Sequence, residues 1–231
     1  MLFTLFDDTT QCTEAEVQRL LPLVSAQRRE QALRFKHLFG RFTCLKSYEM
    51  LQQLVQDVLN GKDGECEKYG CLQDWNGCFV YNEHDKPFLQ SGRSGERIEK
   101  LDFSISHCKE GIAVAIAPHP IGVDIESFRQ YSESLLKKTM NEQEILLIQQ
   151  SAEPSVEFIK LWTKKEALLK CMGKGFHREA KSVEVCGDRF ADGEITYYMK
   201  TKRFADYTVS VCSVNPDFQM KVEFVDLKSI G

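Results

Sequence analysis

The sequence predicts an α+β fold built from two similar halves. Stretches with the apolar spacing of amphipathic helices are followed by short strand-like runs, and this order occurs twice along the chain. The turn-like segment Pro118–Pro120 separates the two halves, so we expect domains at residues 1–117 and 118–231. A chain of 231 residues is long enough to bury a sizeable core.

Helices are expected first. Thr13 followed by Glu16 has the form of a capping box, and Pro22 should shorten or bend the helix that it begins. Ser25 can cap a second helix, and a long amphipathic helix should then end at Asn60–Gly61. The apolar stripe of this long helix consists of Leu45, Tyr48, Leu51, Val55, Val58 and Leu59.

Short strands should follow these helices. Residues 61–76 are polar and glycine-bearing and indicate a loop, and residues 78–83 indicate a strand. Three further strand-like runs come close together, separated by turn signals. They are LDFSIS (101–106), GIAVAIA (111–117) and IGVDIE (121–126).

The second half repeats this order. Helices are expected near 133–139 and 142–150, the latter capped by Asn141 with Glu144. A third helix should run from a Ser155 cap to Gly173. Strands are then expected near 183–187, 194–200, 206–214 and 220–227.

Composition excludes several classes of protein. A net charge of −4 gives no global positive field for nucleic acid or an anionic membrane. No apolar run approaches the roughly 20 residues of a membrane helix, and the amino terminus lacks the features of a signal peptide. The nine cysteines show no zinc-type spacing, and a metal site at Cys66, Cys71 and Cys78 would lack a fourth ligand. We therefore expect reduced thiols in a cytoplasmic protein.

Two acids in IGVDIE are candidate metal ligands. Asp124 and Glu126 lie two residues apart on a strand, so both side chains should face the same side. A cation between them would remove their repulsion, and oxygen ligands suit a hard ion such as magnesium. The motif alone is equally compatible with two solvated acids on an exposed strand.

Two further motifs carry polar groups that suit chemistry. In LWTKKEALLKCMGKG, Glu166 and Lys170 share a helix face, either as an ordinary surface ion pair or as part of a site to which Gly173–Gly175 allows close backbone approach. In FSISHC, Ser106 and His107 point to opposite faces of a strand and cannot form a nucleophile–base pair. His107 is therefore a structural hydrogen-bonding group or a phosphate contact.

In this order and approximate spacing, the three motifs resemble those of the Sfp-type phosphopantetheinyl transferases. The resemblance covers roughly residues 20–180 and includes SAQRREQALRF (25–35) and the Lys86–Pro87 pair. It implies two lobes related by a pseudo-twofold axis, with coenzyme A and magnesium bound in the cleft between them.

The resemblance also implies a role for individual residues. Glu166, or a water on the metal, would be the base. Gln31 departs from the family, which has a second basic residue there, and Arg34 and Cys44 align poorly. The residues carried over are Asp124, Glu126 and Glu166 as magnesium ligands, Lys170 and His107 at the phosphates, Arg28 toward the 3′-phosphate, Lys86 and Pro87 beside the adenosine, and Ser106 as a further coenzyme A contact.

The implied reaction transfers the 4′-phosphopantetheine of coenzyme A to a serine of an apo acyl, peptidyl or aryl carrier protein, releasing 3′,5′-adenosine bisphosphate. Two alternatives stay open: another magnesium-dependent nucleotide or diphosphate transferase, and a non-catalytic module that binds carrier proteins. A cleft within one chain needs no second subunit, so we expect a monomer. Basic residues near the site suit an acidic carrier protein; they are Lys160, Lys164, Lys165, Lys170, Lys174, Arg178 and Lys181.

Overall fold

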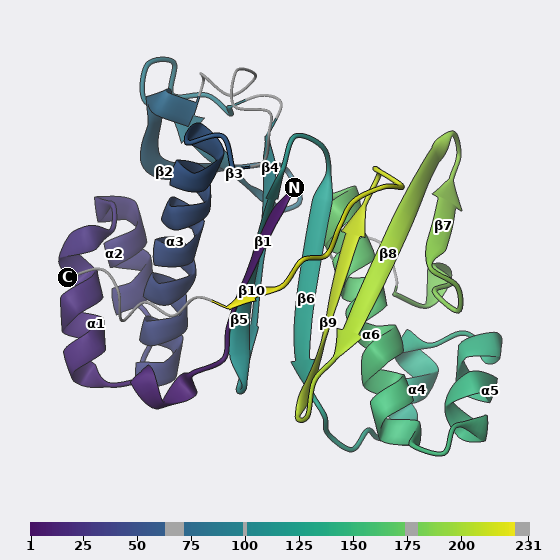
Figure 1. The fold of residues 1–231 in the computed structure, drawn as a ribbon. Helices are drawn as coiled ribbons and strands as arrows, with labels where there is room; N and C mark the ends of the chain where they lie inside the picture. The colour runs from purple at the N-terminus through teal and green to yellow at the C-terminus, as the bar shows by residue number, and fades with distance from the viewer. Residues whose placement is uncertain (63–71, 99–100, 174–179, 225–231) are drawn as a thin grey trace.

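The structure is a computed structural model, and it describes residues 1–62, 72–98, 101–173 and 180–224. The described elements form four layers, helix, sheet, sheet and helix (Figure 1). Helices α1–α3 cover the outer side of the first sheet, and α6 covers the outer side of the second. The expected α+β class with two sheet-containing halves is confirmed, while the pseudo-twofold relation and the domain limits stay predictions.

The first half contains two sheets of different size. The larger has the order β10-β1-β5-β4, in which β10 is parallel to β1 and the other pairs are antiparallel. The smaller is the β2–β3 hairpin. The elements are β1 (Leu2–Phe6), η1 (Thr9–Gln11), α1 (Glu14–Leu20), η2 (Leu21–Leu23), α2 (Ala26–Leu33), α3 (Leu38–Leu59), β2 (Trp75–Tyr81), β3 (Pro87–Ser91), β4 (Asp102–Cys108) and β5 (Gly111–Ala117).

The second half forms an antiparallel sheet of order β6-β9-β8-β7. Although only residues 118–120 separate β5 from β6, the two strands lie in different sheets. The elements are β6 (Ile121–Ser127), α4 (Glu133–Thr139), α5 (Glu142–Gln150), α6 (Pro154–Met172), η5 (Ala180–Ser182), β7 (Arg189–Asp192), β8 (Ile195–Arg203), β9 (Tyr207–Ser213) and β10 (Glu223–Phe224), the last of which joins the first sheet.

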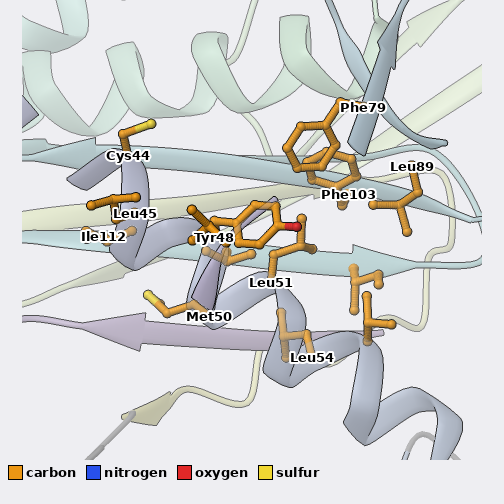
Figure 2. Packing of buried hydrophobic residues seen from close by; sticks show 14 of the residues in the cluster. Cys44, Leu45, Tyr48, Met50, Leu51, Leu54, Phe79, Leu89, Phe103 and Ile112 are labelled. Carbon is orange, nitrogen blue, oxygen red and sulfur yellow. The ribbon is translucent and has the colours of Figure 1, made fainter. Parts of the chain in front are cut away.

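The alternation along β5 explains how the layers stack. Its large residues, including Val114, point toward α3. On α3, the Tyr48 ring packs edge-on against the Phe79 ring, with 5.8 Å between the ring centres (Figure 2). Its alanines, including Ala113 and Ala115, point the other way, against β6 and β9. Small side chains between the sheets let them approach closely.

Most expected caps are confirmed. The Thr13 hydroxyl accepts from the N–H of Glu16, and Asn141 and Glu144 form a complete capping box. The expected Ser155 cap is wrong, because α6 begins at Pro154, a residue favoured in the first helical turn. The Ser155 hydroxyl instead donates to Gln130.

The expected strands need four corrections. Residues 183–187 form no strand, because the N–H of Val185 donates to the buried carboxylate of Glu144 and not to a neighbouring strand. The strand expected at 78–83 is β2, which begins at Trp75 and ends at Tyr81. The strand at the start of the chain, β1, was not expected, and β10 covers only Glu223–Phe224 of the expected 220–227. Residues 225–227 lie outside the described residues.

None of the described helices is both long and apolar enough to cross a membrane.

Candidate active site

The two halves meet where β4 lies beside the free edge of β6. Side chains of β4 satisfy backbone groups of that edge: Asp102 accepts from the N–H of Ile121 and Ser104 from the N–H of Val123, each at 3.0 Å. Because Asp102, Ser104 and Ser106 lie at alternate positions, all three face β6. We call this contact the seam.

Gly122 brings α6 against β6. A Cβ atom added at this residue would lie 1.9 Å from the carbonyl oxygen of Ala167 and 2.5 Å from the backbone nitrogen of Cys171. Only glycine leaves room for this approach, since the neighbouring atoms are helix backbone. The glycine of IGVDIE therefore sets the distance between the strand that carries Asp124 and the helix that carries Glu166.

Asp124 is held on one side and unpartnered on the other. Its Oδ1 accepts from the Ser106 hydroxyl and from Lys170 Nζ, both at 2.7 Å. Lys170 also donates to the Ser106 hydroxyl (3.0 Å) and to the Val123 carbonyl (3.1 Å). Asp124 Oδ2 is buried and has no hydrogen-bond partner among the described residues. A buried carboxylate oxygen without a partner is costly and marks a place where a cation would be stabilised.

Glu126 points to the same helix. Its Oε1 accepts from the indole N–H of Trp162 at 3.2 Å, and Oε2 lies 3.5 Å from Arg129. The expectation that Asp124 and Glu126 share a side is confirmed, because both bond to residues of α6. No sequence motif points to Trp162, although its position four residues before Glu166 places it on the same helix face.

Burial, and after it repulsion between the carboxylates, sets the electrostatics of this group. Burial and the charges of Asp124 and Glu126 raise the pKa of Glu166 to about 7, although Lys170 acts in the opposite direction. Burial and Asp124 also raise the pKa of Glu126. We call Asp124, Glu126 and Glu166 the carboxylate group.

The carboxylate group offers oxygen donors alone and one unpartnered oxygen, so its chemistry fits a hard divalent cation. Within the described part of the chain, however, no three His, Cys, Asp or Glu side chains are gathered closely enough to hold a metal ion as they stand. Lys170 instead supplies the positive charge beside Asp124 at 2.7 Å.

A pocket of about 300 Å³ opens in the first half. It brings together residues of α2, α3, β2 and β4 with the turn between β2 and β3. Its lining residues are Arg28, Gln31, Phe35, Cys44, Ser47, Phe79, Tyr81, Asp85, Pro87, Phe103, Ile105 and His107. Of the coenzyme A contacts implied by the resemblance, it therefore gathers Arg28, Pro87 and His107, and also Gln31 and Cys44.

Arg28 is fixed in this pocket. It donates from Nε to the Cys44 carbonyl (2.9 Å), from Nη1 to Gln31 (2.9 Å) and from Nη2 to the Ser47 hydroxyl (3.0 Å). Its guanidinium also lies 5.9 Å from the centre of the Tyr48 ring. A guanidinium has five N–H groups, so two remain for a ligand. Gln31, which departs from the family pattern, serves to orient Arg28.

His107 lies between the pocket and the carboxylate group. Its side chain is exposed on the pocket wall. Partial desolvation lowers the pKa of the imidazole, and the charges of Lys170 and Arg28 lower it further, while Asp124 raises it. His107 therefore senses charges from both regions.

Lys86 does not reach into the pocket. Its Nζ donates to Asp102 at 2.5 Å and to the Ile121 carbonyl at 3.5 Å, so its charge lies in the seam. The adjacent Pro87 does line the pocket.

The basic residues expected to suit an acidic carrier protein are largely paired with acidic residues of this chain. Lys160 pairs with Glu157 on its own helix. Lys164 pairs with Asp188, and Lys165 with Glu144, the last pair with both side chains fully buried. Lys174 and Arg178 lie outside the described residues, as does Gly175 of the segment expected to allow close backbone approach.

Comparisons with known proteins agree on one family. A model described as "4′-phosphopantetheinyl transferase superfamily" matches residues 120–220, which include the carboxylate group and Lys170. The chain is 24% identical over 230 residues to 4′-phosphopantetheinyl transferase ffp of Bacillus subtilis, covering 94% of each protein. It is 25% identical over 202 residues to 4′-phosphopantetheinyl transferase gsp of Aneurinibacillus migulanus, covering 83% of this chain and 76% of that protein.

A third relative, 4′-phosphopantetheinyl transferase Sfp of Bacillus subtilis strain 168, is 25% identical over 230 residues and covers 94% of each protein. A solved structure of Thermotoga maritima holo-[acyl-carrier-protein] synthase matches 40% of this chain and 61% of its own with a TM-score of 0.33 and 14% identity, which is too weak to bear on the fold. These sequence matches extend over nearly the whole chain at about 25% identity, and together with the family model they show that this chain is similar to the Sfp-type 4′-phosphopantetheinyl transferases.

Proposed function

We propose that this enzyme transfers the 4′-phosphopantetheine of coenzyme A to a serine of an apo carrier protein in a cleft between its two halves. One observation carries the proposal. A pocket with a fixed arginine lies beside three carboxylates whose charges interact. The pKa of His107 depends on charged residues of both regions. This arrangement suits a long ligand with a nucleotide at one end and a pyrophosphate in the middle.

In this proposal, the pocket holds the nucleotide end. The two free N–H groups of Arg28 bind the 3′-phosphate, and the aromatic and proline side chains of the pocket wall lie along the adenosine. Lys170 and His107 neutralise charge on the pyrophosphate, and Ser106 orients Lys170 at 3.0 Å. The Lys86 ammonium group stays in the seam beside Asp102, while its neighbour Pro87 forms part of the pocket wall.

The carboxylate group would hold Mg²⁺ through Asp124, Glu126 and Glu166. A bound Mg²⁺ would stabilise negative charge that develops on the pyrophosphate. Glu166 is the residue that would accept the proton of the incoming serine. The serine oxygen forms a bond to the β-phosphorus, the bond to the leaving oxygen breaks, and 3′,5′-adenosine bisphosphate departs.

The test is the intact mass of apo carrier proteins of the acyl, peptidyl and aryl classes after incubation with enzyme, coenzyme A and magnesium. We expect a gain of one phosphopantetheine on at least one class, lost without magnesium and in Glu166→Gln. Glu157→Gln is the matched control, because Glu157 lies on the same helix and pairs only with Lys160 in the described contacts.

Other outcomes would contradict the proposal. Coenzyme A binding without mass gain on any carrier would favour a binding module. Consumption of coenzyme A at the same rate with and without a carrier would favour a different transferase.

A further inference from the structure

The turn between β2 and β3 is built around one asparagine side chain. Asn82 Oδ1 accepts from the backbone N–H groups of His84 (3.0 Å) and Lys86 (2.8 Å). The backbone N–H of Asn82 donates to the Lys86 carbonyl at 3.0 Å. Such bonds from a side chain to its own turn fix the turn's shape. They use the oxygen of the amide and leave its NH₂ group for a partner outside the turn.

That partner lies in the other half. Asn82 Nδ2 donates to the carbonyl of Gly173 at 3.1 Å, across 91 positions of sequence. Gly173 ends α6 in the left-handed conformation with φ 67°, and its N–H bonds back to the carbonyls of Leu169 and Lys170. A Cβ atom on Gly173 would lie 3.3 Å from Lys86 Cδ, so the turn packs directly on the helix end.

The same turn also forms part of the pocket wall. Asp85 and Pro87 line the pocket, as does Tyr81 at the end of β2. Lys86 extends from the turn into the seam, where it contacts Asp102 and the first residue of β6. The turn thus contacts the pocket, the strand that carries Asp124 and the helix that carries Glu166.

We propose that Asn82 is a positioning residue that ties the pocket wall to the C-terminal end of α6. The inference rests on the proposed function, in which one coenzyme A molecule must reach from the pocket to Lys170 and Glu166. The hydrogen bond to Gly173 fixes the distance between these two anchoring points. Losing it leaves the pocket intact but places the pyrophosphate less accurately against α6.

Asn82→Asp isolates this bond. The substitution keeps an oxygen acceptor for the turn and replaces the donor facing Gly173 with an anionic oxygen, which repels the carbonyl. Asn76→Asp is the matched control: Asn76 Oδ1 likewise accepts from a backbone N–H, that of Cys78, while its Nδ2 donates to Gln90 within the same hairpin.

Three measurements test the proposal: transfer kinetics, affinity for 3′,5′-adenosine bisphosphate by calorimetry, and hydrogen exchange of α6. We expect Asn82→Asp to lower kcat by about tenfold to a hundredfold, the loss typical of small misplacement of reacting groups. Its affinity for 3′,5′-adenosine bisphosphate should be unchanged, and Asn76→Asp should change neither quantity. The nucleotide should slow exchange at the end of α6 in wild type and not in Asn82→Asp.

Wild-type transfer rates in Asn82→Asp would overturn the proposal, as would a parallel loss of nucleotide affinity, which would mean that the turn only shapes the pocket. The exchange experiment keeps the two proposals apart. If the wild-type enzyme transfers nothing, the proposed function fails, whereas the link through Asn82 stands or falls on whether the nucleotide protects α6.

Discussion

The pocket and the carboxylate group are built on opposite principles. In the pocket, Arg28 is held by three hydrogen bonds before any ligand arrives. In the carboxylate group, Asp124 keeps a buried oxygen without a partner among the described residues, and the pKa of Glu166 is raised to about 7. The pocket is therefore ready for its ligand, while the carboxylate group carries an electrostatic cost that a cation would relieve.

The largest effect should come from the buried pair that anchors α6. Lys165→Met would leave the carboxylate of Glu144 buried without its cation and should lower the free energy of unfolding by about 3–5 kcal/mol. Urea denaturation would measure this loss. Lys164→Met is the control. The partner of Lys164, Asp188, is mostly exposed, so this substitution should lower the free energy of unfolding only slightly. Equal effects of the two substitutions would contradict the assignment of Lys165 as an internal anchor.

A second substitution tests whether the carboxylate group depends on close packing of α6 against β6. Gly122→Ala places a methyl group against helix backbone and should cost about 3 kcal/mol or more in the free energy of unfolding, at the upper end for overpacking. Gly187→Ala meets no atom within 4 Å and serves as control. If thermal unfolding shows the two variants equally stable, the close approach described for Gly122 is wrong.

A third prediction concerns the free-energy cost of ionising Glu166 in the metal-free carboxylate group. Because the pKa of Glu166 is higher in the folded protein (about 7) than its ordinary value of 4.5, its contribution to stability is present at low pH and is lost as pH rises through this window. Glu166→Gln should therefore raise the free energy of unfolding relative to wild type by about 1–3 kcal/mol at high pH, and by much less at low pH. A pH series of denaturation curves in chelator would show this. A variant that is less stable at high pH would contradict it.

The smallest effect concerns His107. Its pKa is lowered by desolvation and by Lys170 and Arg28, so bound phosphate should restore the proton. Affinity for 3′,5′-adenosine bisphosphate should rise by about threefold to tenfold as pH falls from about 8 to about 6. Calorimetry in two buffers of different ionisation enthalpy would count the protons taken up. His107→Asn should flatten the dependence, and an unchanged slope would remove His107 from the phosphate contacts.

Local patterns predicted most of the helices because their signals lie within a few residues. The caps at Thr13 and Asn141 and the paired orientation of Asp124 and Glu126 follow from such spacing. The strand β1 was missed, because its pairing with β5 and β10 depends on contacts more than a hundred residues away. The expected strand at 183–187 failed because a buried side chain, Glu144, satisfies its backbone.

Part of the site was also beyond local reasoning. The sequence singled out Lys86 through family resemblance, but no pattern could show that Asp102 draws its ammonium into the seam. Likewise, Lys165 stands among basic residues that suggest a charged surface, and only the fold shows that Glu144 lies opposite it. Pairing between distant elements decides which charges are available to a ligand.

The most direct test of the proposed roles of the pocket and the carboxylate group is the affinity for 3′,5′-adenosine bisphosphate in Arg28→Met and Asp124→Asn. Calorimetry would measure this affinity beside the transfer assay. We expect Arg28→Met to weaken binding by at least about tenfold and Asp124→Asn not to weaken it, while both lose transfer. Weakened binding in Asp124→Asn with unchanged binding in Arg28→Met would contradict the assignment of the nucleotide to the pocket and of the cation to the carboxylate group.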